Sequence, residues 1–300
     1  MEFEWLAIIN PEAGAGRARR LAPQLLEELR REGVRLEAVY SKGPGDAYTI
    51  ASTAASQGVR AFLAIGGDGT AHEVINGALA LAPEGVRLFF AAIPLGTGNS
   101  FLRDFGIRNA KEAVKHFPKA NKHPVDLLQI THSGGTIFSY NLVGLGFAAQ
   151  AGALTNEKYK SLGRLGYVVA VVEETMRLHP LVLPFTTNCT PRDERPFLLL
   201  AFCNSTSTGG GMRMAPRAVV NDGELDIIRI GPMPRLAWIA SFPGIFFGLH
   251  TLNPQVEQRR AQWVSFEPAT PIIPCMIDGE ILHLSISRIE VRHHAIDWFV

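Results

Sequence analysis

The sequence predicts an α/β first half with a mainly parallel sheet and a second half built largely from antiparallel β-strands. Over the first ~125 residues, short apolar runs alternate with helical patterns. After Asp126 the apolar runs become rich in β-branched and aromatic residues, with Gly and Pro turns between them. The 300 residues also suffice for two domains at about 150 residues each.

In the first half, predicted strands and helices alternate along the chain. We expect strands at residues 5–9, 34–39, 61–65 and 88–93, and helices at residues 17–31, 46–57 and 72–81. The first helix has Leu21, Leu25 and Leu29 at helical spacing and ends before Gly33. Since strand–helix–strand units with short connections build parallel sheets covered on both faces, ligands are expected where strand carboxyl ends meet helix amino ends.

In the second half, strands dominate the pattern. We expect strands at residues 136–147, 197–203, 225–230 and 281–291, and one long helix at residues 162–178. The change of pattern places the domain boundary within residues 124–130.

Composition and charge exclude several classes of protein. Hydrophobic residues make up 47% of the chain and charged residues 19%, so it can bury a sizeable core and is not intrinsically disordered. A net charge of +1 gives no support to a nucleic-acid partner. The three cysteines are widely spaced, which argues against a disulfide scaffold or a structural zinc site and fits the cytoplasm.

The first residues and the longest apolar stretch bear on membrane contact. Glu2 and Glu4 stand where a secretory signal needs basic residues. The stretch 236–249 is interrupted by Pro243 and is shorter than the ~20 residues needed to span a bilayer. Its aromatic side chains are of the types found at headgroup depth: Trp238, Phe242, Phe246 and Phe247. The stretch is therefore a candidate for peripheral contact with a membrane, and the alternative is that it fills the core of the second half.

The strongest chemical signal is Gly-Gly-Asp-Gly-Thr at residues 66–70, directly after a predicted strand and before a helix. Glycines let the backbone approach a ligand closely, and a helix amino end suits phosphate. Asp68 would repel a phosphate, so a metal ion or a proton transfer would explain it. The alternative is a tight turn in which Asp68 is a cap.

Two further Gly-rich loops follow predicted strands, at residues 94–100 and 10–16. Loops at equivalent ends of neighbouring parallel strands can bind one ligand together. Arg19 stands where the dinucleotide fingerprint needs its third glycine, so a Rossmann oxidoreductase is disfavoured, and no GxxxxGK[ST] motif is present.

Together these motifs resemble the diacylglycerol kinase catalytic-domain family, which includes soluble bacterial lipid kinases and the sphingosine and ceramide kinases. Residues 66–70 are followed by Glu73 and Asn76-Gly77, and residues 94–99 read Pro-Leu-Gly-Thr-Gly-Asn. The second half continues the family order with Asn204, Gly209–Gly211, Ala215-Pro216, Ala218, Asn221–Gly223, Leu225-Asp226 and Asp278–Glu280. The resemblance covers nearly the whole chain.

The resemblance implies an NAD-kinase-like ATP-binding domain at residues 1–127, a β-rich lipid-binding domain at residues 128–287, and a tail at about 288–300 that packs back on the first domain. By position, the implied ATP contacts are Asn10, Pro11, Glu12, Ala13, Gly14, Ser41, Gly66, Gly67, Asp68, Gly69, Thr70, Ala71, His72 and Thr97.

The resemblance also implies a structural magnesium ion at Asp222, with backbone carbonyls of Val219 and Glu224 as partners. It gives catalytic parts to Asp68, Asp126 and Glu280. By sequence alone, Asp222-Gly223 and Glu280 also read as hairpin turns, and Asp126 as a cap.

One departure from the family pattern concerns the second Gly-rich loop. Ser100 stands where the soluble bacterial relatives usually have Asp, which weakens a metal-binding role for this position. It moves the sequence toward the sphingosine-kinase-like branches. At Ser41 the relatives often have Thr, so a hydroxyl is kept.

The expected function is an ATP- and Mg²⁺-dependent lipid kinase that transfers the γ-phosphate to the hydroxyl of a lipid such as diacylglycerol. The alternatives are other lipid acceptors (sphingosine, ceramide or monoacylglycerol), an NAD-kinase-like enzyme, and a catalytically silent nucleotide or lipid sensor. The oligomeric state is open, with a homodimer among the options.

Overall fold

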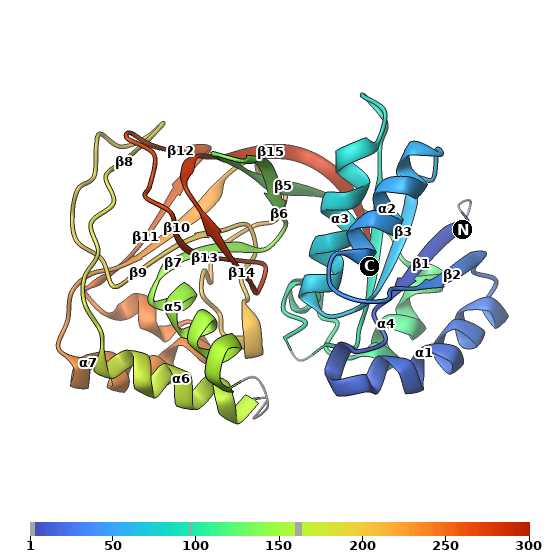
Figure 1. The fold of residues 1–300 in the computed structure, drawn as a ribbon, viewed down its shortest axis with the longest axis horizontal. Coiled ribbons are helices and arrows are strands. Elements are labelled where there is room, and N and C mark those ends of the chain that lie inside the picture. Colours follow the sequence, from blue (N-terminus) through green and yellow to red (C-terminus); the bar gives the residue numbers. More distant parts are fainter. Residues whose placement is uncertain (1–3, 97, 160–163) are drawn as a thin grey trace. The chain divides into compact units, whose positions relative to one another are not determined.

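The computed structural model describes residues 4–96, 98–159 and 164–300, and the chain divides into two compact units. Unit 1 contains the residues up to Val125 together with His294–Val300, and unit 2 contains Asp126–His293. Figure 1 shows the helices and the parallel strands of unit 1 and the β-rich unit 2.

Unit 1 is an α/β sheet in the order β2-β1-β3-β4-β15, with parallel pairing between each pair of neighbours. Its strands are β1 (Trp5–Ile9), β2 (Leu36–Tyr40), β3 (Ala61–Gly66), β4 (Phe89–Pro94) and the end of β15 (Ile286–Phe299). Its helices are α1 (Ala13–Arg31), α2 (Asp46–Ser56), α3 (Asp68–Leu81) and α4 (Ala110–His116), with short turns η1 (Phe101–Phe105) and η2 (Phe117–Lys119).

The last residues of the chain are part of the unit 1 sheet. Trp298 lies opposite Phe90 on β4, is 1% exposed, and stacks near that ring at 6.5 Å between centroids. Arg87 donates to both carboxylate oxygens of the buried Asp297 at 2.6 and 2.8 Å. The carboxyl-terminal strand is thus held by aromatic packing and by a bidentate ion pair.

Unit 2 contains a six-stranded antiparallel sheet in the order β11-β10-β9-β7-β13-β14, and further strands that include β5, β6, β8, β12 and the start of β15. The strands are β5 (Lys122–His132), β6 (Gly135–Ser139), β7 (Leu142–Gly146), β8 (Phe185–Thr187), β9 (Leu199–Cys203), β10 (Leu225–Ile230), β11 (Val256–Ala261), β12 (Trp263–Phe266), β13 (Ile273–Ile277) and β14 (Glu280–Leu284).

The helices described in unit 2 have between 7 and 13 residues. They are α5 (Phe147–Leu154), α6 (Arg164–Met176) and α7 (Arg235–Ser241), with single turns η3 (Thr155–Tyr159), η5 (Gly209–Gly211), η6 (Phe242–Phe247) and η7 (Leu249–Leu252). One apolar cluster, which includes Phe202 and Phe266, fills the space between strands of the two sheets. A second cluster, which includes Phe147 and Trp238, lies under α5 and α7. The predicted fold class is confirmed for both halves.

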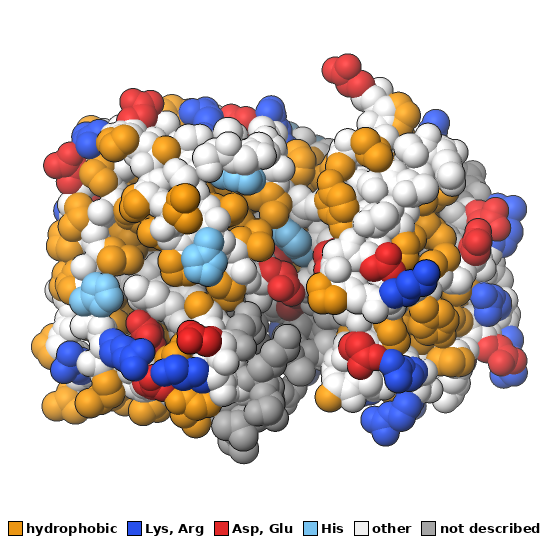
Figure 2. All heavy atoms as spheres, viewed as in Figure 1, with side chains coloured by type: hydrophobic (Ala, Val, Ile, Leu, Met, Phe, Trp, Pro, Cys, Tyr) orange, Lys and Arg blue, Asp and Glu red, His pale blue; other side chains and the backbone are white. Residues whose placement is uncertain are grey.

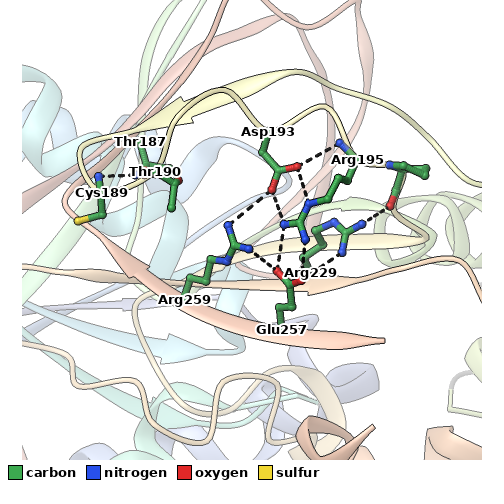
Figure 3. Close-up of polar contacts among 9 residues, drawn as sticks. Thr187, Cys189, Thr190, Asp193, Arg195, Arg229, Glu257 and Arg259 are labelled. Atoms are coloured by element: carbon green, nitrogen blue, oxygen red, sulfur yellow. Dashed lines mark hydrogen bonds and ion pairs between the residues drawn. The ribbon is translucent and has the colours of Figure 1, made fainter. Parts of the chain in front are cut away.

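An ion-pair cluster on unit 2 fastens the segment that follows β8 onto β10 and β11 (Figure 3). Arg195 donates to both oxygens of Asp193 at 2.9 and 2.6 Å and to both oxygens of Glu257 at 2.7 and 3.0 Å. Arg259 contacts the same two carboxylates, at 3.7 and 2.9 Å. Arg195 therefore joins Asp193, in the loop after β8, to Glu257 on β11, although the two are far apart in sequence.

Several predicted elements have different limits in the structure, of which the following matter most. Helix α3 begins at Asp68, four residues earlier than expected, because Gly67 is extended and accepts the first backbone bonds of the helix. The predicted strand 136–147 is two strands, β6 and β7, and the predicted strand 281–291 is β14 followed by the longer β15. The expected helix at residues 162–178 corresponds to α6, and residues 162 and 163 lie outside the described residues.

Candidate active site

Three strand-to-helix loops come together at the carboxyl edge of the unit 1 sheet. They follow β1, β3 and β4, which are neighbours with parallel pairing. The backbone joins the first two, since Asn10 N–H donates to Ile65 O at 3.0 Å. It also joins the last two, since the N–H groups of Leu95 and Gly96 donate to Gly66 O at 2.7 and 2.9 Å. The three loops therefore form one surface, as the strand order requires.

The glycines of these loops are needed because the backbones lie very close together. A Cβ on Gly96 would lie 2.3 Å from the Cα of Gly67, and a Cβ on Gly14 would lie 2.3 Å from Leu95 O. A Cβ on Gly66 would lie 2.3 Å from the hydroxyl oxygen of Thr70. A larger side chain at Gly14 or Gly96 would force the loops apart, and one at Gly66 would clash with Thr70 within the same loop.

Asp68 is the first residue of α3 and is half-buried. Its carboxylate accepts the Ser100 N–H at 3.2 Å and the Ser100 hydroxyl at 3.0 Å. Ser100, the position that departs from the family pattern, is thus a hydrogen-bond donor to the carboxylate at the amino end of α3. A negative charge at this end of a helix is favourable.

Two side chains also connect the loops, through hydrogen bonds to partners that are distant in the sequence. Arg17 donates through Nη2 to Leu95 O and Gly96 O at 2.8 and 2.9 Å. Asn10 donates through Nδ2 to the Thr70 hydroxyl at 3.3 Å. The sequence motifs assign no role to Arg17; its place directly after Gly16 was the available signal.

The other residues proposed for ATP occupy the same edge or lie next to it. Ser41 directly follows β2, is 5% exposed, and its N–H donates to Ile9 O at 2.8 Å. Pro11, Glu12 and Ala13 follow Asn10 in the first loop, and Gly69, Ala71 and the buried His72 belong to the first turns of α3. Thr97 lies outside the described residues.

In unit 2, Asp126 on β5 is fully buried and holds the loop of residues 219–224. Its Oδ2 accepts the Gly223 N–H at 2.7 Å, and its own N–H donates to Val220 O at 2.8 Å. Its Oδ1 lies 3.0 Å from Nδ1 of His293, within hydrogen-bond distance. A Cβ on Gly223, whose φ is +78°, would lie 3.2 Å from that nitrogen. No motif marked His293 in the sequence.

The Asp-Gly-Glu motif separates into a structural and an exposed carboxylate. Asp278 and Gly279 form the two-residue turn between β13 and β14, with φ of +50° and +91°. Asp278 is 2% exposed and its carboxylate accepts the Ser139 hydroxyl at 2.6 Å and three backbone N–H groups from residues 140–142. Glu280 is the first residue of β14 and is exposed to solvent.

Asn204 connects the surroundings of Asp126 and Asp278. Its Nδ2 donates to Asp126 O at 2.8 Å and to Tyr140 O at 2.9 Å, and the Tyr140 N–H donates to Asp278. The structure thereby brings Asp126 and Asp278 into one buried polar network. Among the described residues, no hydrogen bond links Glu280 to this network.

Two of the three residues proposed for a structural magnesium ion, Asp222 and Glu224, have side chains that already contact a cationic partner. Arg260 on β11 forms an ion pair with Oδ2 of Asp222, and its Nη1 lies 3.0 Å from Oε2 of Glu224. Oδ1 of Asp222 accepts the Glu224 N–H at 3.1 Å. The Asp222 carboxylate therefore does not fit a hard cation without displacement of Arg260, and the magnesium site stays a prediction.

Asp226 is a further buried carboxylate near this loop. It is 1% exposed on β10 and accepts Nε2 of Gln258 at 2.8 Å. Burial raises the pKa of Asp226 above its ordinary value, and the nearby Glu224 acts in the same direction.

The chain matches two family models. Residues 4–130 match the diacylglycerol kinase catalytic domain, and residues 141–300 match the YegS C-terminal NAD kinase beta sandwich-like domain. A diacylglycerol kinase of Mycobacterium tuberculosis (strain ATCC 25618 / H37Rv) is 30% identical over 277 residues, which cover 91% of this chain and 87% of that protein. The chain belongs to the family of diacylglycerol kinase-like lipid kinases.

Further similarities extend over the same length. A YegS-like lipid kinase of Stenotrophomonas maltophilia (strain K279a) is 29% identical over 294 residues, covering 95% of this chain and 92% of that protein. A diacylglycerol kinase structure from Bacillus anthracis (strain Sterne) has a TM-score of 0.71 at 23% identity and covers 99% of this chain and 97% of that one. At 23% identity, this structural likeness shows the fold of the present chain. None of its described helices is both long and apolar enough to cross a bilayer.

Proposed function

We propose that the protein is an ATP- and Mg²⁺-dependent kinase that transfers the γ-phosphate to the hydroxyl of a lipid, diacylglycerol being the first candidate. The observation that carries this proposal is the junction of three Gly-rich loops around Asp68. Gly67, Gly96 and Gly14 let these loops lie in direct backbone contact. Such a surface suits a chain of phosphates better than a planar or apolar ligand.

On the nucleotide side, each part of unit 1 has a distinct task. Gly69 belongs to the first turn of α3, where backbone N–H groups have no acceptor within the helix, and its N–H would donate to a phosphate oxygen. Arg17 keeps the loop after β4 against the loop after β1. The magnesium ion that accompanies ATP supplies neutralisation of phosphate charge, and Asp68 is the residue proposed to hold it.

On the acceptor side, phosphoryl transfer needs an aligned hydroxyl whose proton can leave. Glu280 is proposed as the carboxylate that accepts this proton, because it is exposed at the start of β14, where its side chain is open to a substrate. Asp126 is fully buried, and its proposed part is positioning: it orients His293 and fixes the loop of residues 219–224.

Access to the lipid is proposed to involve an apolar surface formed by α7, η6 and η7. Six large side chains there are between 43% and 82% exposed: Leu236, Ile239, Phe246, Phe247, Leu249 and Leu252. Figure 2 shows hydrophobic side chains along the edge where α6 and α7 lie in Figure 1. Residues 231–256 contain no Asp or Glu and include Arg235, so the surface suits an anionic bilayer.

The sequence-based membrane hypothesis needs one correction. Trp238 is 5% exposed and packs edge-on against Phe147 at 4.7 Å between ring centroids, so it belongs to the core. Phe242 is partly buried against the same cluster. The bilayer contact is therefore proposed for the neighbouring exposed side chains and not for Trp238.

The proposal is tested by incubating the purified chain with labelled ATP, MgCl₂ and a panel of acceptors in detergent micelles. Diacylglycerol, monoacylglycerol, sphingosine, ceramide and NAD should be compared at equal concentration. Phosphorylation of one lipid well above the others supports the proposal and names the acceptor. Phosphorylation of NAD alone would identify the NAD-kinase-like alternative, and binding of nucleotide without any product would identify a silent sensor.

A further inference from the structure

The loop of residues 219–224 brings two carboxylates to one guanidinium. Oδ2 of Asp222 forms an ion pair with Nη2 of Arg260, and Oε2 of Glu224 lies 3.0 Å from Nη1 of the same residue. The side chains of Asp222 and Glu224 are 24% and 31% exposed, and that of Arg260 is 43% exposed. The planar guanidinium of Arg260 thus neutralises the carboxylates of Asp222 and Glu224, which would otherwise repel each other.

The Asp222 carboxylate has both oxygens engaged. Oδ1 accepts the Glu224 N–H at 3.1 Å, and Oδ2 accepts from Arg260. A magnesium ion would need oxygen ligands at about 2.0–2.1 Å in near-octahedral geometry. The guanidinium occupies one oxygen of the carboxylate and would repel the ion electrostatically, so the two cations exclude each other.

The position of Arg260 is fixed by strand register and not by the loop itself. Strands β10 and β11 pair over six residues, with Asp226 directly opposite Arg260. Directly opposite residues of an antiparallel pair point to the same face of the sheet, and residue i+2 shares that face. Arg260 and Glu224 therefore lie on the same face where the loop enters β10.

A second position of the family pattern also carries a protein donor in place of an acid. Ser100 stands where the family pattern has Asp, and both its N–H and its hydroxyl donate to Asp68. Ser100 therefore adds no second carboxylate beside Asp68, which remains the residue proposed to hold the ion that accompanies ATP. In both units a neutral or cationic donor stands beside the aspartate that the family pattern gives to a metal ion.

We propose that Arg260 is a built-in counter-cation that replaces the structural divalent ion at Asp222. The loop then keeps its conformation at any free magnesium concentration, because the guanidinium is part of the chain and does not dissociate. The inference concerns the structural ion alone and not the ion that accompanies ATP. Thermal stability and metal content test it, and neither measurement depends on whether the protein transfers phosphate.

The test uses the full chain without nucleotide. The Tm of the wild type in EDTA should equal that in millimolar MgCl₂ or CaCl₂ at matched ionic strength, within about 1 °C. Arg260→Gln should lower the Tm in EDTA by about 2–4 °C, and MgCl₂ should restore part of this loss saturably. The Tm falls because Asp222 and Glu224 lose their counter-charge. It recovers with MgCl₂ because a magnesium ion can then bind between them.

Arg259→Gln is the matched control, because Arg259 is on the same strand and pairs with Asp193 and Glu257 instead. It should destabilise the protein without creating a magnesium response. A Tm of the wild type that falls by several degrees in EDTA and recovers with Mg²⁺ would overturn the proposal. So would equal metal responses of the two variants.

Metal analysis of the wild type keeps the proposal testable if Arg260→Gln does not fold. After gel filtration in buffer without chelator, the protein should carry less than ~0.1 equivalent of Mg²⁺ or Ca²⁺. About one equivalent per chain, lost together with thermal stability on chelation, would show that the loop binds an ion despite Arg260.

Discussion

The contact between Asp68 and Ser100 decides how the carboxylate of the Gly-Gly-Asp-Gly-Thr motif is oriented. Two donors from one residue, at 3.0 and 3.2 Å, hold it at the first position of α3. The helix amino end also favours its negative charge. Asp68 is thus held in place by its neighbours, and such preorganisation is what the proposed electrostatic role in phosphoryl transfer requires.

Asp68→Asn should lower kcat/KM for phosphoryl transfer by about 10²-fold or more while the Tm stays within a few degrees of the wild type. The amide keeps the size and one acceptor oxygen but removes the charge that the reaction needs. Steady-state assays with the preferred lipid, together with thermal unfolding, measure both effects. Ser100→Ala should give a smaller loss, because the backbone N–H contact remains. A folded Asp68→Asn that retains most of its rate would reduce Asp68 to a helix cap.

At the residue scale, sequence reasoning identified motifs better than contacts. It marked Ser100 as a departure, but the donor role toward Asp68 depends on the loop after β4 lying against α3. Arg17 bonds to carbonyls 78 and 79 residues away, and His293 bonds to an aspartate 167 residues away. Partners so distant in sequence follow from strand order and register, which no local pattern contains.

The loop after β1 allows a direct test of whether close contact between loop backbones matters for ATP. Gly14 and Gly16 both have positive φ, +62° and +79°, but a Cβ on Gly14 would lie 2.3 Å from Leu95 O, whereas nothing lies within 4 Å of one on Gly16. Gly14→Ala should raise the KM for ATP about tenfold or more, because the loop after β4 must move. Gly16→Ala carries only the left-handed strain and should change the KM little. Equal KM values for the two variants would show that the loop contact is irrelevant to ATP.

The segment from α7 to η7 gives an element-scale prediction for membrane contact. Phe247→Glu and Leu252→Glu should each lower affinity for phosphatidylglycerol-containing vesicles about tenfold or more, since burying one such side chain contributes roughly 1.5–3 kcal/mol. Vesicle sedimentation measures this, and the variants should fold normally. Leu81→Glu is the control, because Leu81 is 55% exposed on unit 1.

A core variant and one contradicting result complete the test of membrane contact. Trp238→Glu should misfold, because its side chain is in the core. If Phe247→Glu sediments with vesicles as well as the wild type does, the exposed apolar surface is not a membrane surface.

Elements were predictable from sequence where apolar residues dominate them. All six residues of β3 and all five of β1 are buried, and both strands were predicted within a residue. Strand β11, with sequence Val-Glu-Gln-Arg-Arg-Ala, was missed because most of its side chains carry charge or amides. The division between β6 and β7 was also missed, since it depends on Asp278 binding the backbone of residues 140–142.

The acid stability of the whole molecule should depend on the cluster of Figure 3. Hydrogen bonds from Arg195 hold the pKa values of Asp193 and Glu257 below their ordinary values of 3.8 and 4.5. Since both are lowered in the folded state, their contribution is complete above about pH 5 and is lost as the pH falls through the folded-state values. Arg195→Gln should therefore lower the Tm at pH 7 and flatten its decline between pH 5 and 3.

Thermal unfolding at half-unit pH steps measures this dependence. Arg192→Gln is the control, because Arg192 pairs with the exposed Glu194 and should leave the curve unchanged. An Arg195→Gln curve that runs parallel to the wild type would assign the acid dependence to other carboxylates.

The carboxyl-terminal strand has a consequence for how the protein is made on the ribosome. Residues 294–300 complete the sheet of unit 1, whose other strands are all synthesised before residue 95. Until residues 294–300 are synthesised, β4 is therefore an open sheet edge, available for pairing with other chains. Folding of unit 1 cannot finish before that point, so the nascent chain has to protect this edge for some 200 residues. A truncation before residue 294 would leave it open permanently.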